Sequence, residues 1–282
     1  MKLISSKIFS VIILSFVINY AIFSQENGNK IFDEYLNQYL QIKNVPSISS
    51  GLFEKGEIRW LKAVGKSDLE NNIPASTSSL YRIASISKPI TAVAILQLWE
   101  QGLISLDTDA RAYLPNFPVK KYKFTVRQLL NHTSGIRNYR EGEFDSKKFY
   151  ATTDDVLKLL AYDSLMFEPG TKYAYTTLGY TLLAAIVGKV SKTSFEDYLK
   201  NNVFIPAGMQ STMVDKQREI ILNRVQGYEK NAERKIVNAP LADLSIKVAG
   251  GGYLSTPNDL LLFAKALLEN KILKQSTLEM ML

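Results

Sequence analysis

Hydrophobic and polar positions along the chain predict strands, then helices, then strands again. Apolar residues recur at helical spacing over residues 31–42, which predicts an amphipathic helix. Two short apolar-rich runs follow, Ser47–Phe53 and Ile58–Val64, and the four residues between them include Gly56. A short polar connection with glycine is typical of a β-hairpin. We therefore expect an antiparallel sheet to begin early in the chain.

The middle of the chain predicts a mainly helical region, at about residues 85–210. Residues 89–102 are apolar on most sides, so this helix is expected inside the protein rather than on its surface. Short helices and loops are expected from Leu103 to Phe167. The other predicted helices are Val126–Leu130, Asp154–Leu160, Leu178–Val190 and Phe195–Val203.

Strand-like sequence returns at Arg224–Tyr228 and Gly250–Leu254, and Thr256-Pro257-Asn258-Asp259 then opens a helix. This order predicts an α+β fold, in which an antiparallel sheet flanked by helices carries a large helical insertion. Near the end, Ser276-Thr277-Leu278-Glu279 fits a capping box, yet only three residues follow it. We interpret the sequence as one domain that is incomplete at the C-terminus, with its last strands missing.

The first 24 residues predict a signal peptide, and residues 25–282 the domain itself. Lys2 and Lys7 form a positive segment, an apolar stretch follows over residues 8–23, and Ser24 is a small residue before Gln25. An uncleaved anchor is the alternative, but a spanning helix needs about 20 apolar residues. We therefore expect a secreted or periplasmic protein with no stable membrane span after cleavage.

Composition narrows the chemistry more than the charge does. The net charge is +7, and the one basic run is Lys120-Lys121-Tyr122-Lys123, which we interpret as a solvated face, so no nucleic-acid partner is predicted. There are no cysteines and His132 is the single histidine. These counts exclude disulfides, thiol nucleophiles and multi-histidine metal sites. No cofactor or metal is predicted, and hydrolytic chemistry must use Ser, Thr, Tyr, Lys or carboxylates.

Ser85 and Lys88 form an S-x-x-K motif at the entry to the predicted buried helix. Positions i and i+3 share one helix face, so the amine can lie beside the hydroxyl. Burial disfavours a charged lysine, and a neutral amine can take the proton of a serine nucleophile. The alternative is structural: Ser85 caps the helix and Lys88 extends to solvent.

Tyr175 is the second candidate catalytic residue. It precedes the predicted helix at Leu178 by a short distance, so its hydroxyl can project from a loop, and a phenol beside an ammonium can relay protons. The alternative is an aromatic core cluster with Tyr173 and Tyr180.

Five segments in a fixed order carry a family resemblance. They are Ser85-x-x-Lys88, Leu129-Leu130-Asn131-His132-Thr133-Ser134-Gly135, Pro169-Gly170 leading to Tyr175, Pro206-Ala207-Gly208-Met209, and Gly251-Gly252-Tyr253-Leu254-Ser255-Thr256. Together the sequence resembles the class C β-lactamase-related serine hydrolases, which include penicillin-binding proteins and D-alanyl-D-alanine carboxypeptidases. The resemblance runs from about Ile31 to Leu282.

The resemblance implies a β-lactamase/transpeptidase-like fold and roles for three residues. Ser85 is the expected acylated nucleophile, Lys88 its activating base, and Tyr175 the proton-shuttling first residue of the Y-x-N motif. His132 falls in the family's H-T-S-G signature, which is a structural turn. We therefore do not assign His132 to a Ser-His-Asp triad, because a triad is recognised by geometry.

The sequence departs from the family pattern at two places. Thr177 stands at the third position of Y-x-N, where we expect it to line the substrate site, and its short hydroxyl cannot copy an amide that both donates and accepts. The family's third motif, a Lys- or His-containing triplet ending in glycine on a late strand, is expected beyond Leu282.

These observations predict an exported serine hydrolase that forms an acyl-enzyme at Ser85. The expected partner is a small-molecule or peptide substrate: a β-lactam, a D-Ala-D-Ala-type peptide or an ester. The alternative is a non-catalytic peptidoglycan- or peptide-binding relative, or a truncated inactive fragment. The sequence makes no prediction of the oligomeric state.

Overall fold

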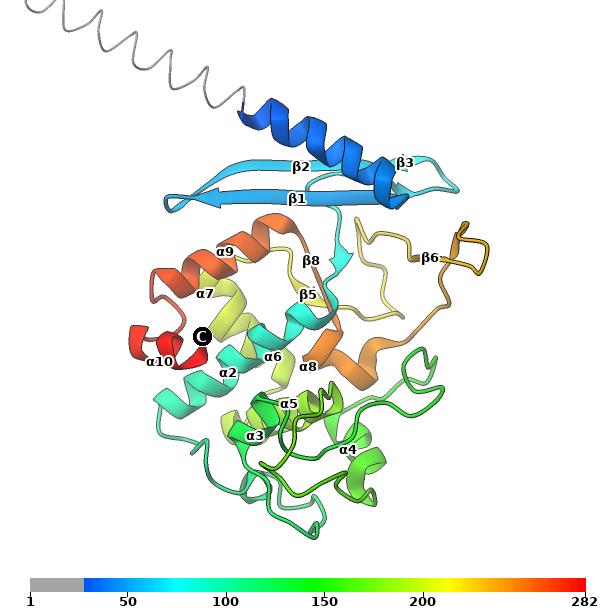
Figure 1. Ribbon diagram of the computed structural model, residues 1–282. Helices are drawn as coiled ribbons and strands as arrows, with labels where there is room; N and C mark the ends of the chain where they lie inside the picture. Colours follow the sequence, from blue (N-terminus) through cyan, green and yellow to red (C-terminus); the bar gives the residue numbers. More distant parts are fainter. Residues whose placement is uncertain (1–27) are drawn as a thin grey trace, which may run out of the picture.

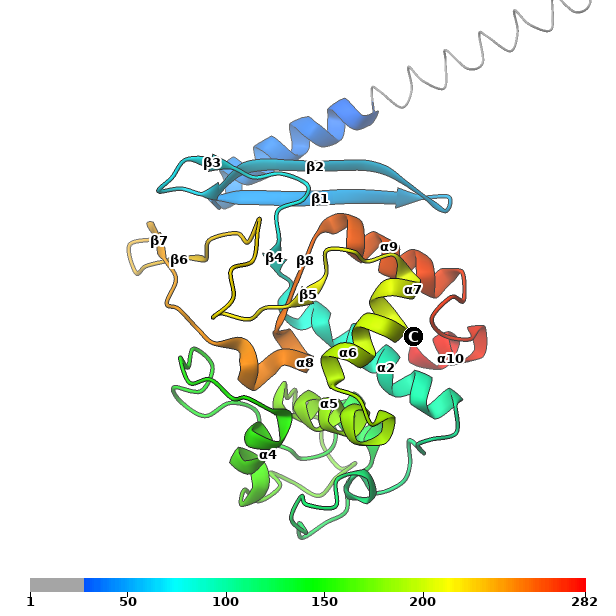
Figure 2. The ribbon, with the colours of Figure 1, turned by 180° about the vertical axis from the view of Figure 1, so that it is seen from behind.

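A sheet with a helix on each face lies at one end of the molecule, and a group of helices lies at the other (Figures 1 and 2). The computed structural model describes residues 28–282, so the predicted signal peptide lies outside the described residues. The N-terminal helix, residues 28–43, covers the outer face of the sheet, and α9 (Pro257–Leu268) covers the inner face. This arrangement confirms the α+β prediction.

The predicted hairpin is the main part of the sheet. β1 (Ser47–Glu54) pairs antiparallel with β2 (Glu57–Asp68), and β2 pairs with β3 (Ile73–Pro74). Gly56 turns the chain with a φ of 83°, a conformation that glycine adopts without steric cost. On the outer face, Asp33 of the N-terminal helix accepts hydrogen bonds from Trp60 Nε1 and Lys62 Nζ, each 2.8 Å long. The hairpin therefore fixes the N-terminal helix.

Two buried helices form the centre of the helical part. α2 (Ser87–Glu100) packs against α5 (Leu178–Ser191), and Ile90, Val93 and Ile95 of α2 are completely buried. Their burial confirms the expectation drawn from the apolar surface of this helix. No helix within residues 28–282 is long and apolar enough to cross a bilayer. The surrounding helices are α3 (Val126–Leu130), α4 (Thr153–Ala161), α6 (Phe195–Leu199), a π-helical turn (Lys200–Phe204) and α7 (Ile205–Ala207).

A small antiparallel sheet joins the two parts and positions the candidate residues. Its strand order is β4 (Tyr81–Arg82), β8 (Tyr253–Ser255) and β5 (Met213–Val214). The Ile83 N–H donates to the Tyr253 carbonyl at 3.0 Å. Segments about 170 residues apart in sequence are thereby held side by side, and Ser85 lies in the 3₁₀ turn that follows β4.

Two strand predictions were wrong in their placement. The segment at residues 224–227 makes only an isolated bridge between Arg224 and Leu80, and the strand starts at β6 (Tyr228–Lys230), which pairs with β7 (Ile236–Asn238). The glycine run expected in a strand begins in α8 (Val248–Gly251) instead. A helical turn forms here because the Gly252 N–H donates to the Val248 carbonyl at 3.0 Å.

The predicted last helix exists, but its start and cap were wrong. α10 runs from Gln275 to Met281, and its N-cap is Lys274, which makes no side-chain capping bond. Ser276 therefore lies inside the helix. The Gln275 side chain donates to Glu279 one turn later at 2.9 Å, which stabilises this first turn without a capping box.

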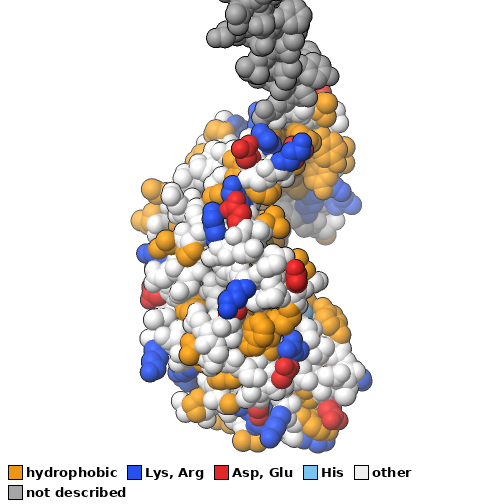
Figure 3. Space-filling model, turned by 90° about the vertical axis from the view of Figure 1, so that its left-hand side faces the viewer, with side chains coloured by type: hydrophobic (Ala, Val, Ile, Leu, Met, Phe, Trp, Pro, Cys, Tyr) orange, Lys and Arg blue, Asp and Glu red, His pale blue; other side chains and the backbone are white. Residues whose placement is uncertain are grey.

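The solvated-face interpretation was wrong for Lys120 and correct for its neighbours. Lys121 and Lys123 are exposed, and on the face shown in Figure 3 basic side chains are scattered among acidic and apolar ones. Lys120 is 9% exposed, and its ammonium donates to the carbonyls of Leu160, Ala161 and Asp163 at 2.6–2.7 Å. It therefore satisfies carbonyls at the C-terminal end of α4, where a cation is favoured.

Replacing Lys120 by methionine should destabilise the protein by about 2 kcal/mol, because charged hydrogen bonds contribute about 1.5–3 kcal/mol and their loss leaves buried carbonyls unpaired. Urea denaturation measures the change, and Lys121→Met, on an exposed neighbour, should stay within about 0.5 kcal/mol of wild type. Equal effects of the two substitutions would show that Lys120 does not stabilise the end of α4.

Candidate active site

Ser85 lies in a strained turn at the entrance to α2. It is the middle residue of the 3₁₀ turn Ala84–Ile86, and Ala84 has a φ of 47°, in the left-handed region. Non-glycine residues pay a steric cost there, and such residues cluster at functional sites. Ser85 is exposed, whereas α2 begins at Ser87 without any side-chain cap. The interpretation of Ser85 as a helix cap was therefore wrong.

Lys88 is buried and turned towards Ser85. It is 5% exposed, and Nζ donates to the Gly250 carbonyl at 2.6 Å, to Ser85 Oγ at 3.2 Å and to Thr177 Oγ1 at 3.3 Å. No carboxylate among residues 28–282 forms an ion pair with it. Burial lowers the pKa of Lys88, and the neighbouring Tyr175 opposes this only partly. At a given pH, the amine of Lys88 is therefore neutral more often than the amine of an exposed lysine.

Tyr175 completes the contacts of the Ser85 hydroxyl. Its O–H donates to Ser85 Oγ at 2.7 Å, and Lys88 Nζ lies 4.7 Å from the centre of its ring. Burial alone would raise the pKa of Tyr175, but Lys88 and Ser85 hold it below the usual value. Tyr173 and Tyr175 are exposed and only Tyr180 is buried, so the alternative interpretation as an aromatic core cluster was wrong for Tyr175.

His132 orders the turn beneath Tyr175 and makes no hydrogen bond to Ser85. Its Nδ1 accepts from the Thr176 N–H at 3.2 Å, and its ring centre lies 4.5 Å from that of Tyr175. Burial, and then the charge of Lys88, lowers the pKa of His132. The structure thus places His132 as a support for the Tyr175 segment, as the H-T-S-G resemblance implied.

The structure brings together Ser85, Lys88, Tyr175 and Thr177, and adds groups that the sequence analysis did not select. The Gly250 carbonyl is the shortest contact of Lys88, and Asn138 Oδ1 accepts from the Thr177 N–H at 3.1 Å. A backbone carbonyl carries no residue-type signal. Asn138 follows the H-T-S-G segment by only a few residues, which is the signal that could have identified it.

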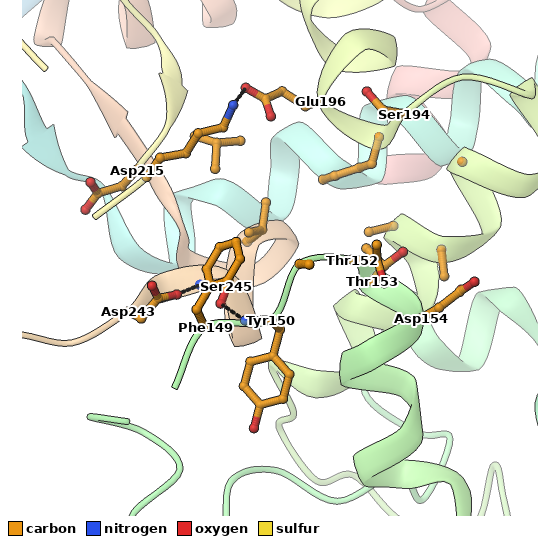
Figure 4. A pocket seen from close by; sticks show the side chains of 18 of the residues that line it. Phe149, Tyr150, Thr152, Thr153, Asp154, Ser194, Glu196, Asp215, Asp243 and Ser245 are labelled. Carbon is orange, nitrogen blue, oxygen red and sulfur yellow. Dashed lines mark hydrogen bonds and ion pairs between the residues drawn. The ribbon is translucent and has the colours of Figure 1, made fainter. Parts of the chain in front are cut away.

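A cavity of about 670 Å³ is lined by residues of α4, α5, α6 and β5 (Figure 4). Its wall includes Phe149, Glu196 and Ser245, and none of Ser85, Lys88, Tyr175 and Thr177 lines it. Val248 lines the cavity while Gly250, two residues later, contacts Lys88, so α8 separates the two. Within the described part of the chain, no group of three or more His, Asp or Glu side chains is placed to hold a metal ion.

Comparisons with known proteins agree with this geometry. The sequence model of the family described as Beta-lactamase matches residues 32–282. Human "Serine beta-lactamase-like protein LACTB, mitochondrial" is 31% identical over 79% of this chain and 53% of its own length. "Penicillin-binding protein 4*" of Bacillus subtilis is 33% identical over 80% of this chain and 53% of its own length. The chain thus spans about half the length of these curated relatives.

A solved structure extends the comparison. The D-amino acid amidase from Ochrobactrum anthropi SV3, solved with L-phenylalanine, matches with a TM-score of 0.76 and 25% identity, over 87% of this chain and 74% of that one. The family match and the likeness to the penicillin-binding protein homologue from Pyrococcus abyssi (TM-score 0.75, 27% identity, 88% of this chain and 58% of that one) confirm the β-lactamase/transpeptidase-like fold implied by the sequence motifs.

Gly250→Ala should slow the reaction of Ser85 with a fluorophosphonate probe by about 10- to 100-fold. An added Cβ would lie 2.5 Å from Thr177 Cγ2 and 3.4 Å from Lys88 Nζ, and a displacement of about 1 Å at such a site can cost about 100-fold in rate. Gly251→Ala is the matched control, because its nearest contact is 3.8 Å. If both variants react at the wild-type rate, Gly250 is not needed to position Lys88.

The same reaction should accelerate with pH until Lys88 is neutral, and then level off below the ordinary lysine pKa of 10.5. The cause is that only the neutral amine takes the Ser85 proton. Lys88→Arg, which stays charged throughout, should lower the plateau by at least about 100-fold. A rate that keeps rising through pH 10.5 would contradict a lowered pKa for Lys88.

Proposed function

The chain belongs to the beta-lactamase family, and from this premise we propose that it is an exported serine hydrolase that forms an acyl-enzyme at Ser85. The proposed substrates are β-lactams, D-Ala-D-Ala-type peptides or esters. The name of the Bacillus subtilis relative, a penicillin-binding protein, and that of the D-amino acid amidase support this range. Residues 1–24 support export through their signal-peptide pattern.

One observation carries the proposal: Ser85 Oγ is held between Lys88 Nζ and the Tyr175 hydroxyl, at 3.2 and 2.7 Å. Neutral Lys88 takes the Ser85 proton, and Oγ forms a bond to the substrate's carbonyl carbon. Tyr175 gives its proton to the departing nitrogen or oxygen as the carbonyl–heteroatom bond breaks, and the proton held by Lys88 restores the phenol. Water then attacks the acyl carbon, which releases the acid and free Ser85.

The start of α2 supports the same chemistry electrostatically. This helix has 14 residues and begins two positions after Ser85. Its positive N-terminal end stabilises negative charge nearby, including the charge that develops on a carbonyl oxygen during attack. This position therefore favours acyl transfer, in which such negative charge develops, over simple binding.

Wild-type protein should be labelled by a fluorescent penicillin, an activated ester, or both, and Ser85→Ala should lose all labelling. The rate of ester hydrolysis by Ser85→Ala should be at least about 1000-fold below that of wild type, because removal of a nucleophile leaves only binding and electrostatic contributions to catalysis. Gel fluorescence and spectrophotometric ester hydrolysis measure these quantities.

Two results would contradict the proposal. Labelling that persists in Ser85→Ala would remove Ser85 as the nucleophile. If wild-type protein binds the fluorescent penicillin only reversibly and hydrolyses no ester, the chain is instead a non-catalytic binding relative.

A further inference from the structure

Tyr139 presents a polar group that the fold leaves unsatisfied. Its hydroxyl oxygen is buried, and no contact of that oxygen among residues 28–282 meets the geometry of a full hydrogen bond. Buried polar groups are almost always paired, so each exception calls for an explanation. The phenol ring itself is well packed, 5.5 Å from the ring of Phe144 between ring centres.

The Tyr139 hydroxyl lies beside Thr177. The two side chains are near enough for the Thr177 hydroxyl to act on the phenol as a hydrogen-bonding group and oppose the rise in pKa that burial causes. Two hydrogen bonds hold residues 137–138 against residues 176–177. Asn138 Oδ1 accepts from the Thr177 N–H at 3.1 Å, and the Thr176 hydroxyl donates to the Arg137 carbonyl at 2.7 Å.

The hydrogen count around Lys88 shows why the direction of the Thr177 hydroxyl matters. A neutral amine has two N–H groups and one lone pair, and Lys88 Nζ has three neighbours: the Gly250 carbonyl, Thr177 Oγ1 and Ser85 Oγ. The Gly250 carbonyl can only accept. If Thr177 also accepts, the lone pair is left for the Ser85 proton. If Thr177 donates, it occupies the lone pair that Ser85 needs.

We propose that Tyr139 is a positioning residue whose hydroxyl oxygen accepts the Thr177 hydroxyl proton and so keeps Thr177 an acceptor towards Lys88. The lone pair of Lys88 then faces Ser85. This inference deepens the proposed function and rests on it. It also assigns a use to threonine at this position. A hydrogen bond to the neighbouring phenol fixes the direction of the threonine hydroxyl, which would otherwise rotate freely.

Apart from Tyr139 itself, a Tyr139→Phe substitution leaves the charged and titratable groups nearby unchanged. Lys88 is faced by Tyr175, Tyr180 and His132. Tyr139 is faced by Tyr175 and Glu143, and by Lys247, whose Nζ lies 5.5 Å from its ring centre. Removing one phenol oxygen leaves these charges and the ring packing in place, so the substitution isolates the hydroxyl.

The test compares Tyr139→Phe with Tyr198→Phe in the full chain. Tyr198, in α6, also has a buried hydroxyl without a hydrogen bond of full geometry. It is not among the hydrogen-bond partners of Lys88. Tyr139→Phe should slow acylation of Ser85 by the activated ester about tenfold, the loss expected for one hydrogen bond. The substrate concentration for half-maximal rate should not change, and Tyr198→Phe should react as wild type.

A second readout is independent of activity. Nuclear magnetic resonance titration of ¹³C-labelled lysine should show a lower pKa for Lys88 in Tyr139→Phe, because the released Thr177 proton stabilises the neutral amine. A lower pKa combined with a slower reaction is not expected from simple loosening of the fold. In a Thr177→Val background, Tyr139→Phe should have no further effect on either quantity.

The proposal is overturned if Tyr139→Phe and Tyr198→Phe behave alike in both measurements, or if Tyr139→Phe retains its full effect in the Thr177→Val background. The proposed function fails separately, and visibly, if wild-type protein is not acylated. The titration then still decides whether Tyr139 controls the protonation of Lys88.

Discussion

A buried lysine that forms no ion pair with any carboxylate among residues 28–282 is the constraint on which the site depends. Lys88 is held by a backbone carbonyl and two hydroxyls, which satisfy hydrogen bonds but leave the charge unbalanced. Folding therefore favours the neutral amine and lowers the pKa of Lys88. The corresponding contribution to stability is complete above the ordinary lysine pKa and is lost as the pH falls through the lowered one. Below the lowered pKa the buried charge makes the fold less stable, and this is the cost of keeping a reactive base.

The architecture explains how such a residue is kept in place. The small sheet of β4, β8 and β5 brings the start of α2 next to the end of α8, so the Gly250 carbonyl meets Lys88. A side chain at residue 250 would collide with Thr177, which explains glycine there. On the other side, His132, Arg137 and Asn138 accept hydrogen bonds from the N–H groups of residues 176 and 177 and from the Thr176 hydroxyl. Three separate chain segments thus converge on one amine.

Much of this could be predicted from the sequence, because periodicity and the S-x-x-K spacing are local signals. The hairpin, the buried α2 helix and the proximity of Ser85 to Lys88 follow from spacing alone. Lys120 and the glycine run could not be predicted in this way. The first is buried by carbonyls 40 residues away, and the second forms a helical turn whose Gly250 carbonyl accepts from Lys88, a residue far away in the sequence. Tyr139 is likewise defined by its neighbours and not by any pattern.

The central claim is that the Ser85 hydroxyl, activated by Lys88, becomes covalently acylated. Mass spectrometry of protein quenched during turnover of an activated ester, followed by peptide mapping, tests it most directly. The account predicts a mass increase equal to the acyl group on the peptide that carries Ser85, absent from Lys88→Arg. Acylation of a different residue, or consumption of the ester with no adduct on Ser85 at any quench time, would contradict it.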